Sequence, residues 1–218
     1  MGRPVVVRGQ RLLVVVAHPD DEAMFFVPVI TAAVRAGAAV SVLSLSTGNA
    51  YGLGRVREKE AQACGAVLGL SNVACVDDRR LPDGMEEEWE AGHVAAVIGR
   101  HLDTHPADAV VTFDVGGVSG HRNHVAVCHG ARRVAAARQD LPVWGLHSCP
   151  LPRKYLSIGD AVPTLCALMC AGGRVAVSAR PWTSHAAMCA HRSQYVWYRA
   201  LFVVFSRYTI INTFSRLM

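Results

Sequence analysis

The sequence predicts an α/β fold in which helices cover both faces of a mostly parallel sheet. Short apolar runs of strand length recur along the chain, and longer segments of helical composition separate them. Polar residues gather directly behind two of these runs, where α/β proteins place ligand-binding side chains. With 218 residues, 51% of them hydrophobic, the chain can bury one sizeable core. We therefore expect a single domain over residues 1–218.

Each expected element follows from its composition. Strands are predicted where β-branched and other apolar residues run together, at 12–17, 39–45, 73–76, 109–113 and 143–146. Helices are predicted for the longer intervening segments, at 21–36, 55–69, 87–103 and 122–138. The basic, proline-containing segment at 150–160 predicts a loop. Strands that alternate with helices pair in parallel through crossover connections. The expected architecture is a Rossmann-like fold of three layers.

The charge pattern argues against nucleic acid as a partner. The formal net charge is +5, but the basic residues are scattered, with pairs at Arg79/Arg80 and Arg132/Arg133 instead of one dense stripe. A mild attraction to anionic lipid fits this charge equally well. The seven cysteines are an odd set without a CxxC pair, in a chain too large to need disulfides, which indicates a reducing environment.

No segment predicts a secretory signal or an ordinary transmembrane helix. Arg8, Gln10 and Arg11 interrupt the apolar N-terminal stretch. No apolar run reaches the roughly 18–20 residues that span a bilayer, since residues 161–173 are too few and arginines break residues 195–214.

Residues 191–218 are the expected membrane-interface segment. Aromatic residues such as Trp197, Tyr198 and Tyr208 alternate there with Arg199 and Arg207. Aromatic rings favour the headgroup layer, and arginine side chains extend to lipid phosphates. We expect an interfacial or partly buried helix over 195–214.

A polar cluster follows the first predicted strand. His18, Asp20, Asp21 and Glu22 come directly after the apolar run that ends at residue 17. In a parallel α/β sheet, this position is the carboxyl end of a strand, where ligands bind. One of the aspartates could simply cap the next helix, but a cap needs one acid, and here a histidine accompanies three.

A second polar cluster follows the fourth predicted strand. After a glycine-containing loop, His121 and His124 stand three residues apart at the start of a helix, one turn apart. Alone, this pair is weak evidence. Together with His18 and Asp21 it provides the two histidines and one carboxylate typical of a catalytic zinc with an open position.

These residue types suggest roles in hydrolysis of an amide. His18, Asp21 and His124 are the expected ligands of Zn²⁺ or of another divalent metal. Asp20 is the expected general base for a water molecule, because it is an adjacent carboxylate that is not itself a ligand. His121 is expected to stabilise the oxyanion and to protonate the leaving nitrogen.

The motifs resemble those of the LmbE-like zinc de-N-acetylases. "AHPDDE" (17–22) is similar to the first metal motif of that family, and "GHRNH" (120–124) to the second. Further stretches resemble its eukaryotic branch, the N-acetylglucosaminyl-phosphatidylinositol de-N-acetylases: "STGNAYGLGRVREKEAQACGAVLGL" (46–70), "LPDGMEEEW" (81–89) and "HRSQYVWYRALFVVFSRYTIIN" (191–212). The resemblance covers the chain from about residue 11 onward.

The resemblance implies a substrate, a location and site residues. It implies removal of acetate from N-acetylglucosaminyl-phosphatidylinositol in glycosylphosphatidylinositol (GPI) anchor synthesis, at the cytoplasmic face of the endoplasmic reticulum membrane. The metal ligands, base and electrostatic partner it implies are the five residues given above. The vertebrate enzymes carry an N-terminal transmembrane helix that we do not find in this sequence, so we expect peripheral or weak membrane attachment.

Four further residues are candidates for binding substrate or for shaping the site. Arg57, which with Glu60 matches the family, could bind a phosphate or sugar, or lie on a solvated helix face. Asn49 could touch the sugar or form a turn. Asn123 could orient His121 or the substrate, or simply be solvated. Asp83 is expected chiefly as a turn former and could instead line the site.

Two rival functions remain open. A non-catalytic nucleotide-binding module on the same sheet would need glycines and amides after the first strand, where this chain has acids. A zinc hydrolase of a soluble N-acetylglucosamine conjugate would have little use for the aromatic, basic segment 195–214.

Overall fold

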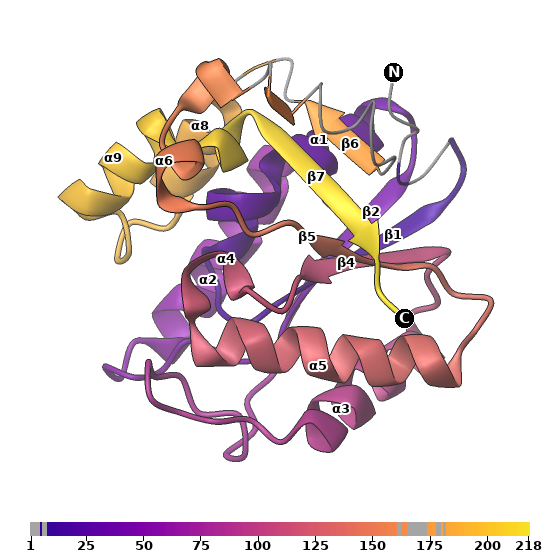
Figure 1. Cartoon of the computed structure of the whole chain (residues 1–218). Helices are drawn as coiled ribbons and strands as arrows, with labels where there is room; N and C mark the ends of the chain where they lie inside the picture. The colour runs from indigo at the N-terminus through magenta and orange to yellow at the C-terminus, as the bar shows by residue number, and fades with distance from the viewer. Residues whose placement is uncertain (1–4, 6–7, 161–162, 165–173, 178–179, 181) are drawn as a thin grey trace.

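The computed structural model describes residues 5, 8–160, 163–164, 174–177, 180 and 182–218. Within these residues, seven strands form one sheet in the order β3-β2-β1-β4-β5-β7-β6 (Figure 1). The strands are β1 (Arg11–Val16), β2 (Ala39–Ser44), β3 (Asn72–Cys75), β4 (Ala109–Phe113), β5 (Val143–Leu146), β6 (Arg174–Val177) and β7 (Ile211–Arg216).

The first five strands are parallel, as expected. In the register of the sheet, β1 lies between β2 and β4, with Val14 opposite both Val42 and Val111. After its first residue β1 is buried throughout, because helices cover it on both faces. Strand β7 is antiparallel to β5 and to β6, so the sheet is mixed at one side.

Helices form a layer on each side of the sheet. Helices α1 (Val27–Arg35), α2 (Gly54–Leu68) and α8 (Trp182–Ala190) lie on one face, and α3 (Ala91–Thr104) and α5 (Arg122–Ala137) pack together on the other (Figure 1). The shorter helices are α4 (Gly117–Gly120), α6 (Leu151–Lys154) and α9 (Trp197–Phe205). The predicted three-layer α/β fold is confirmed.

Two predicted helices differ in their boundaries. The segment 21–36 divides into a π-helical turn, η1 (Glu22–Phe26), and α1, which carries Pro28 in its first turn, where a missing N–H costs nothing. The segment 87–103 becomes helical only at Ala91, because the Glu90 side chain caps α3 by accepting the N–H groups of Gly92 and His93. The predicted loop at 150–160 contains α6 and a 3-10 turn at Ser157–Asp160.

The prediction of one helix over 195–214 was wrong. Helix α9 ends at Phe205, and β-branched residues that follow, such as Ile211, form the buried strand β7. Arg207 is 1% exposed and pairs with the buried Asp160, with Nε 2.6 Å from Oδ2, so it does not extend to a lipid phosphate. Tyr208 is likewise fully buried.

None of the helices in the described part of the chain is both long and apolar enough to cross a bilayer. Most of the apolar stretch 161–173 lies outside the described residues.

Candidate active site

The predicted site residues gather where the chain leaves β1 and β4. These neighbouring strands are parallel, but the helices that follow them cover opposite faces of the sheet. A crevice opens at the carboxyl ends of strands at such a switch point. His18 and Asp21 follow β1, and His121 and His124 follow β4, so topology alone brings the two clusters together.

The loop after β1 is held by the carboxylate of Asp21. Its Oδ2 accepts the backbone N–H groups of Ala17 at 3.1 Å and His18 at 2.9 Å. The preceding residue, Asp20, has φ of 117°, a left-handed conformation that is rare for a residue with a side chain. Its backbone N–H donates to Glu22 Oε2 at 3.1 Å. Strain of this kind is typical of functional sites.

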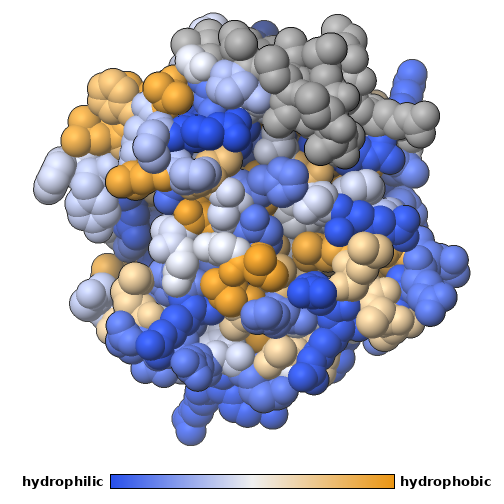
Figure 2. Space-filling model, in the orientation of Figure 1, coloured by the Kyte–Doolittle hydropathy of each residue, from blue (hydrophilic) through white to orange (hydrophobic). Residues whose placement is uncertain are grey.

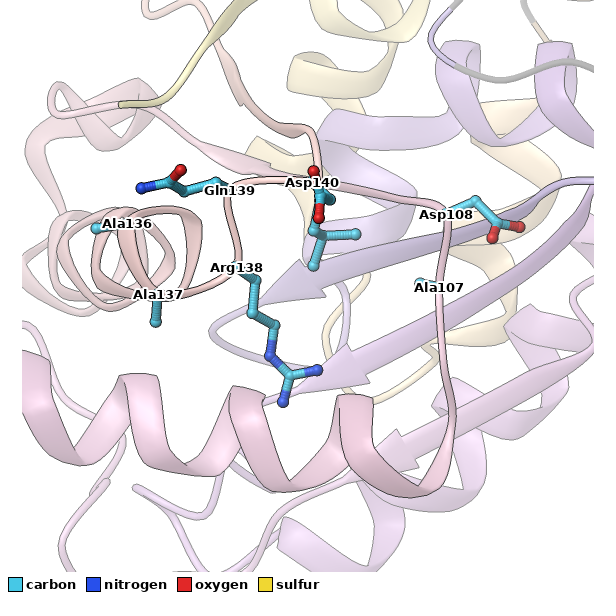
Figure 3. A pocket seen from close by; sticks show the side chains of 8 residues that line it. Ala107, Asp108, Ala136, Ala137, Arg138, Gln139 and Asp140 are labelled. Atoms are coloured by element: carbon cyan, nitrogen blue, oxygen red, sulfur yellow. The ribbon is translucent and has the colours of Figure 1, made fainter.

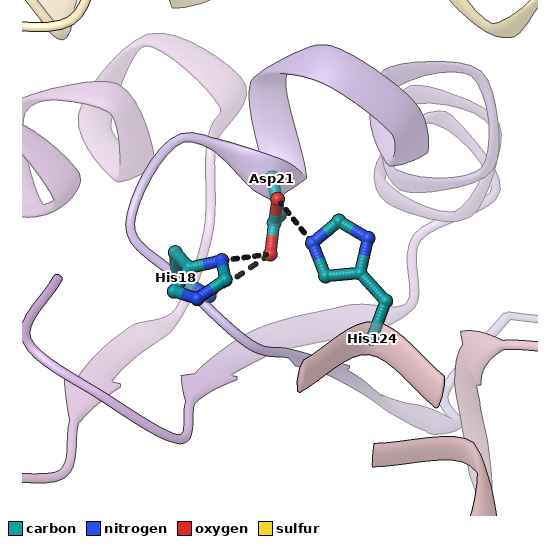
Figure 4. A group of neighbouring side chains, drawn as sticks. All are labelled: His18, Asp21 and His124. Carbon is teal, nitrogen blue, oxygen red and sulfur yellow. Dashed lines mark hydrogen bonds and ion pairs between the residues drawn. The ribbon is translucent and has the colours of Figure 1, made fainter. Parts of the chain in front are cut away.

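His18, Asp21 and His124 converge on one point (Figure 4). His18 Nδ1 lies 3.6 Å from Asp21 Oδ2, and His124 Nε2 lies 3.3 Å from Asp21 Oδ1. All three side chains are buried. The His124 ring stacks on Phe113 with centroids 4.1 Å apart, which fixes its plane.

The outward nitrogen of each imidazole is bound to oxygen. His124 Nδ1 lies 3.0 Å from the carbonyl oxygen of Gly117, and His18 Nε2 lies 3.0 Å from Asn123 Oδ1 and 3.1 Å from Asp83 Oδ1. Because these oxygens only accept, the outward nitrogens carry hydrogens, which leaves His18 Nδ1 and His124 Nε2 facing Asp21. Metal-binding histidines are held in the same way, by a second hydrogen bond to oxygen.

This arrangement fits a divalent metal. His124 Nε2 is buried and has no hydrogen-bond partner, although it faces a carboxylate oxygen. Burial lowers the pKa of His18, but hydrogen bonds to Asp21 and Asp83 and their charges outweigh it and raise the pKa to about 10. The cluster therefore demands positive charge, which a cation among two nitrogens and a carboxylate would supply.

Asp20 lies beside this cluster, between two arginines. Its Oδ1 is 3.2 Å from Arg57 Nη2 and its Oδ2 is 3.2 Å from Arg199 Nη2. Burial raises the pKa of Asp20, the two arginines oppose this shift, and the charge of Asp21 reinforces it. A buried carboxyl with a raised pKa is suited to exchange protons.

Arg57 is a buried cross-link of the site. It donates to the carbonyl oxygens of Gly48 at 2.9 Å and Pro19 at 2.8 Å, and to Asp83 Oδ2 at 3.1 Å, besides its contact with Asp20. Gly48 has φ of 68°, and a Cβ there would lie 2.3 Å from Arg57 Cζ, so only glycine fits against this guanidinium.

His121 is a neutral imidazole with a fixed tautomer. Its Nδ1 accepts the backbone N–H of Asn123 at 3.2 Å, which leaves the hydrogen on Nε2. Burial, followed by the charges of His124 and His18, lowers the pKa of His121 to about 4. His121 therefore offers an N–H donor at the site.

These side chains line one cavity of about 440 Å³. Tyr51, Met85, Gln194, Tyr198 and Arg199 line it as well. Volumes of this order suit a ligand the size of a sugar with a substituent.

Comparisons with known proteins place the chain in a family. The family model described as PIG-L, GlcNAc-PI de-N-acetylase, matches residues 13–135. An N-acetylglucosaminyl-phosphatidylinositol de-N-acetylase of Bos taurus is 42% identical over 215 residues, which cover 95% of this chain and 83% of the relative. The chain belongs to the PIG-L family. It is thus a de-N-acetylase, an enzyme that hydrolyses an amide.

Other comparisons agree with the PIG-L assignment. A probable de-N-acetylase of the same name from Schizosaccharomyces pombe is 37% identical, covering 95% of this chain and 87% of the relative. Among solved structures, the N,N'-diacetylchitobiose deacetylase of Pyrococcus horikoshii has a TM-score of 0.64 at 16% identity, covering 95% of this chain and 83% of that chain. At 16% identity, the likeness to the Pyrococcus horikoshii structure concerns the fold alone.

Two residues predicted to bind substrate, Asn49 and Asn123, do not line the cavity of this PIG-L protein. Asn123 is fully buried behind the site, where its Nδ2 donates to the carbonyl oxygen of Glu87 and its Oδ1 faces His18. Asn49 accepts the N–H of Gly54 at 2.8 Å and lines a neighbouring hollow of about 300 Å³. The structure does not bring Asn49 together with His18, Asp21 and His124.

Site residues that come from the C-terminal segment, such as His191 and Arg199, were not predicted. His191 Nε2 lies 2.6 Å from Glu22 Oε1, and both side chains are buried. Glu60 fastens the same segment by accepting the N–H and hydroxyl of Ser193 at 2.7 Å and 2.6 Å. Glu60 matches the family motif, but the sequence alone does not show that Ser193 is its partner. Asp83, expected chiefly in a turn, links His18 to Arg57.

A larger hollow, of about 670 Å³, has no such chemistry (Figure 3). It lies where β4 and β5 begin, at the opposite end of the strands from the site. Two of its three charged side chains are already paired, Arg138 with Asp103 and Asp108 with Arg11, and the third, Asp140, is exposed. The candidate site is therefore the cavity at the carboxyl ends of the strands.

Proposed function

We propose that the protein removes the acetyl group from N-acetylglucosaminyl-phosphatidylinositol (GlcNAc-PI). The reaction would be the second step of GPI anchor synthesis, at the cytoplasmic face of the endoplasmic reticulum membrane. The named relatives support this substrate, since one is 42% identical across 95% of the chain. The observation that carries the proposal is the convergence of His18, Asp21 and His124 beside Asp20 in one cavity.

We assign the metal ligands to His18, Asp21 and His124. Two imidazole nitrogens and one carboxylate suit Zn²⁺, and another divalent metal would use the same donors. When bound, the metal would lower the pKa of a water molecule and polarise the acetyl carbonyl. In a competing set, His18 with Asp83 and His121, the His18 nitrogen that faces Asp83 is Nε2, which already lies 3.0 Å from Asn123 Oδ1. The first set is favoured because His18 Nδ1 and the unpartnered His124 Nε2 both face Asp21.

Asp20 acts as the general base in this proposal. It receives a proton from the attacking water as the new C–O bond forms at the acetyl carbon. The C–N bond then breaks, and Asp20 returns the proton to the sugar nitrogen, so the products are acetate and a free amine. Arg57 and Arg199 hold the two oxygens of this carboxylate in place.

His121 stabilises the oxyanion by donating from Nε2. Its neutral state supports this role better than that of a general acid, which would need a second ring proton near neutral pH. Arg57 and Asn123 bind protein oxygens with their side chains. We therefore assign them to positioning the site and not to binding the sugar.

The test is deacetylation of GlcNAc-PI by the zinc-loaded, full-length protein in detergent micelles. Mass spectrometry should detect acetate and glucosaminyl-phosphatidylinositol, and a chelator should stop the reaction until Zn²⁺ is restored. Turnover of a soluble N-acetylglucosamine conjugate without any turnover of GlcNAc-PI would favour the soluble-substrate rival. Absence of hydrolysis of either substrate by the zinc-loaded protein would overturn the proposed function.

A further inference from the structure

Helix α9 turns its apolar side outward. Five of its nine residues are large hydrophobic residues that are about half exposed or more: Trp197 (75%), Tyr198 (54%), Leu201 (49%), Val204 (59%) and Phe205 (51%). They recur every three or four positions and so share one side of the helix. On an ordinary surface helix, this side would face the core.

The α6 segment extends the same apolar surface. Leu151, Tyr155 and Leu156 are 68%, 46% and 50% exposed. Tyr155 packs edge-on against Phe202 of α9, with ring centroids 6.1 Å apart. In Figures 1 and 2, α6 and α9 lie together at the upper left, where apolar side chains gather. We call Trp197, Leu201, Val204, Phe205, Leu151, Tyr155 and Leu156 the outer apolar face.

The charge of the surrounding chain is strongly one-sided. Residues 141–218 contain eight arginine or lysine residues and a single acid, Asp160, whose side chain is fully buried. The remaining acids of the protein all precede residue 141. Three of these basic residues, Arg180, Arg192 and Arg216, are exposed. An apolar face on a segment of this charge, which has no exposed carboxylate of its own, is complementary to an anionic lipid surface.

The outer apolar face adjoins the mouth of the active-site cavity. Tyr198 and Arg199 line the cavity, and both belong to α9. Arg199 reaches inward to Asp20 at 3.2 Å, whereas Trp197 and Leu201, two positions to either side, remain exposed. One short helix therefore provides both the outer surface and part of the cavity wall.

We propose that the outer apolar face rests on the bilayer and positions the cavity over the lipid headgroup. The identity of that lipid depends on the proposed function, but the binding of the face to lipid does not. A second copy of the chain is a less suitable occupant, because two segments with the same excess of basic residues would repel each other. The apolar side chains would enter the interface, while an exposed arginine of the same segment, such as Arg192, would be available to lipid phosphates.

Vesicle flotation of the full-length protein tests the proposal. Removal of the segment would also remove β7, so substitutions are preferable. In Trp197→Gln/Leu201→Gln/Phe205→Gln, glutamine keeps the helix propensity and removes the apolar side chains. The matched control, Val56→Gln/Val67→Gln, changes exposed valines on α2. The vesicles contain phosphatidylcholine with one-fifth phosphatidylinositol. The wild type and the control should float with them, and the fraction of the triple variant that floats should be at least tenfold smaller.

A soluble probe separates this proposal from the proposed function. N-acetylglucosaminyl-inositol, which lacks the lipid, should be deacetylated equally by the wild type and the triple variant. GlcNAc-PI in vesicles should be deacetylated by the wild type only. Failure of the wild type on both substrates would refute the proposed function, while flotation would still decide the role of the face.

Three results would overturn the proposal: a wild type that does not float, a folded triple variant that floats equally, or a wild-type dimer that the substitutions convert to a monomer. Circular dichroism and zinc content establish that the triple variant is folded. If it is not, Leu151→Gln/Leu156→Gln tests the same face from the α6 segment, with the same expected loss and the same contrary results.

Discussion

Arg199 of helix α9 forms an ion pair with Asp20, with Nη2 3.2 Å from Oδ2. The two residues are 179 positions apart in the sequence. Arg199 also donates from Nη1 to the carbonyl oxygen and the side chain of Gln194, at 2.8 Å and 2.9 Å, so its guanidinium is fixed on both sides. The proposed base is thus oriented by the helix that carries the outer apolar face.

Arg199→Gln should lower kcat on soluble N-acetylglucosaminyl-inositol by about 3–10-fold. The pair is only partly exposed and Arg57 remains on the other oxygen, so a loss of about 1 kcal/mol is expected. Zinc content should not change. Arg192→Gln, at an exposed arginine of the same segment, is the control and should retain wild-type kcat. Equal kcat for the two variants would refute a positioning role for Arg199.

His124→Ala should weaken zinc binding by more than about 100-fold, the upper end for loss of a partner that only orients a ligand. His129→Ala, an exposed histidine on the same helix α5, should bind zinc as the wild type does. Competition with a chromophoric chelator measures both affinities. Unchanged affinity in His124→Ala would remove this residue from the ligand set.

Asp20→Asn should retain zinc and lose about 10²–10⁴-fold of kcat, because an amide cannot accept the proton of water. The measurement is kcat on the soluble substrate, with zinc content determined on the same sample. Loss of zinc together with activity would instead make Asp20 a ligand. Near-normal turnover would exclude it from the mechanism.

The Glu22–His191 pair should make stability depend on pH. Burial opposes the charge on His191, but Glu22 outweighs it and raises the pKa of His191 above its ordinary value of 6.5. The contribution of this pair to the free energy of unfolding is therefore complete below pH 6.5. It is lost as the pH rises through the pKa that His191 has in the folded protein. His191→Leu should reduce the free energy of unfolding by about 3–5 kcal/mol at pH 6, because it leaves Glu22 buried and unpaired.

Urea unfolding of zinc-saturated samples measures this effect. The difference between the wild type and His191→Leu should shrink steadily above pH 6.5. A difference that stays constant from pH 6 to pH 9 would show that His191 acts through packing alone.

Arg207→Leu should destabilise the fold by about 3–5 kcal/mol without changing vesicle binding, because Arg207 is buried against Asp160. Arg216→Leu, at an exposed arginine of the same segment, should leave stability within about 0.5 kcal/mol. Flotation of folded Arg207→Leu at the wild-type level is expected. A specific loss of flotation would restore the interfacial role first expected for this arginine.

The parallel half of the fold and the convergence of His18, Asp21 and His124 could be predicted from sequence because both depend on local signals. Val14 and Val111 lie in apolar runs that predict buried strands, and the polar residues after those runs must meet at one edge of the sheet. The ring orientations could not be predicted. They depend on oxygens such as that of Gly117, which tertiary packing brings to His124.

The C-terminal half could not be predicted because its partners are distant. Strand β7 is antiparallel to β5 and β6. It is therefore not part of the strand–helix–strand alternation from which the parallel strands were predicted. Arg199 and Arg207 look alike in the sequence. One lines the cavity and the other is in the core, and only the positions of Asp20 and Asp160 distinguish them.

The place of β7 has a consequence for synthesis on the ribosome. Strand β7 lies between β5 and β6 but is translated after both, and among the described strands β6 pairs only with β7. At about 5–20 residues per second, the 33 residues between β6 and β7 delay it by a few seconds. During that interval the nascent chain exposes an unpaired edge on β5, a template for misassembly with other chains. Protection by chaperones would therefore matter most between the emergence of β6 and the insertion of β7.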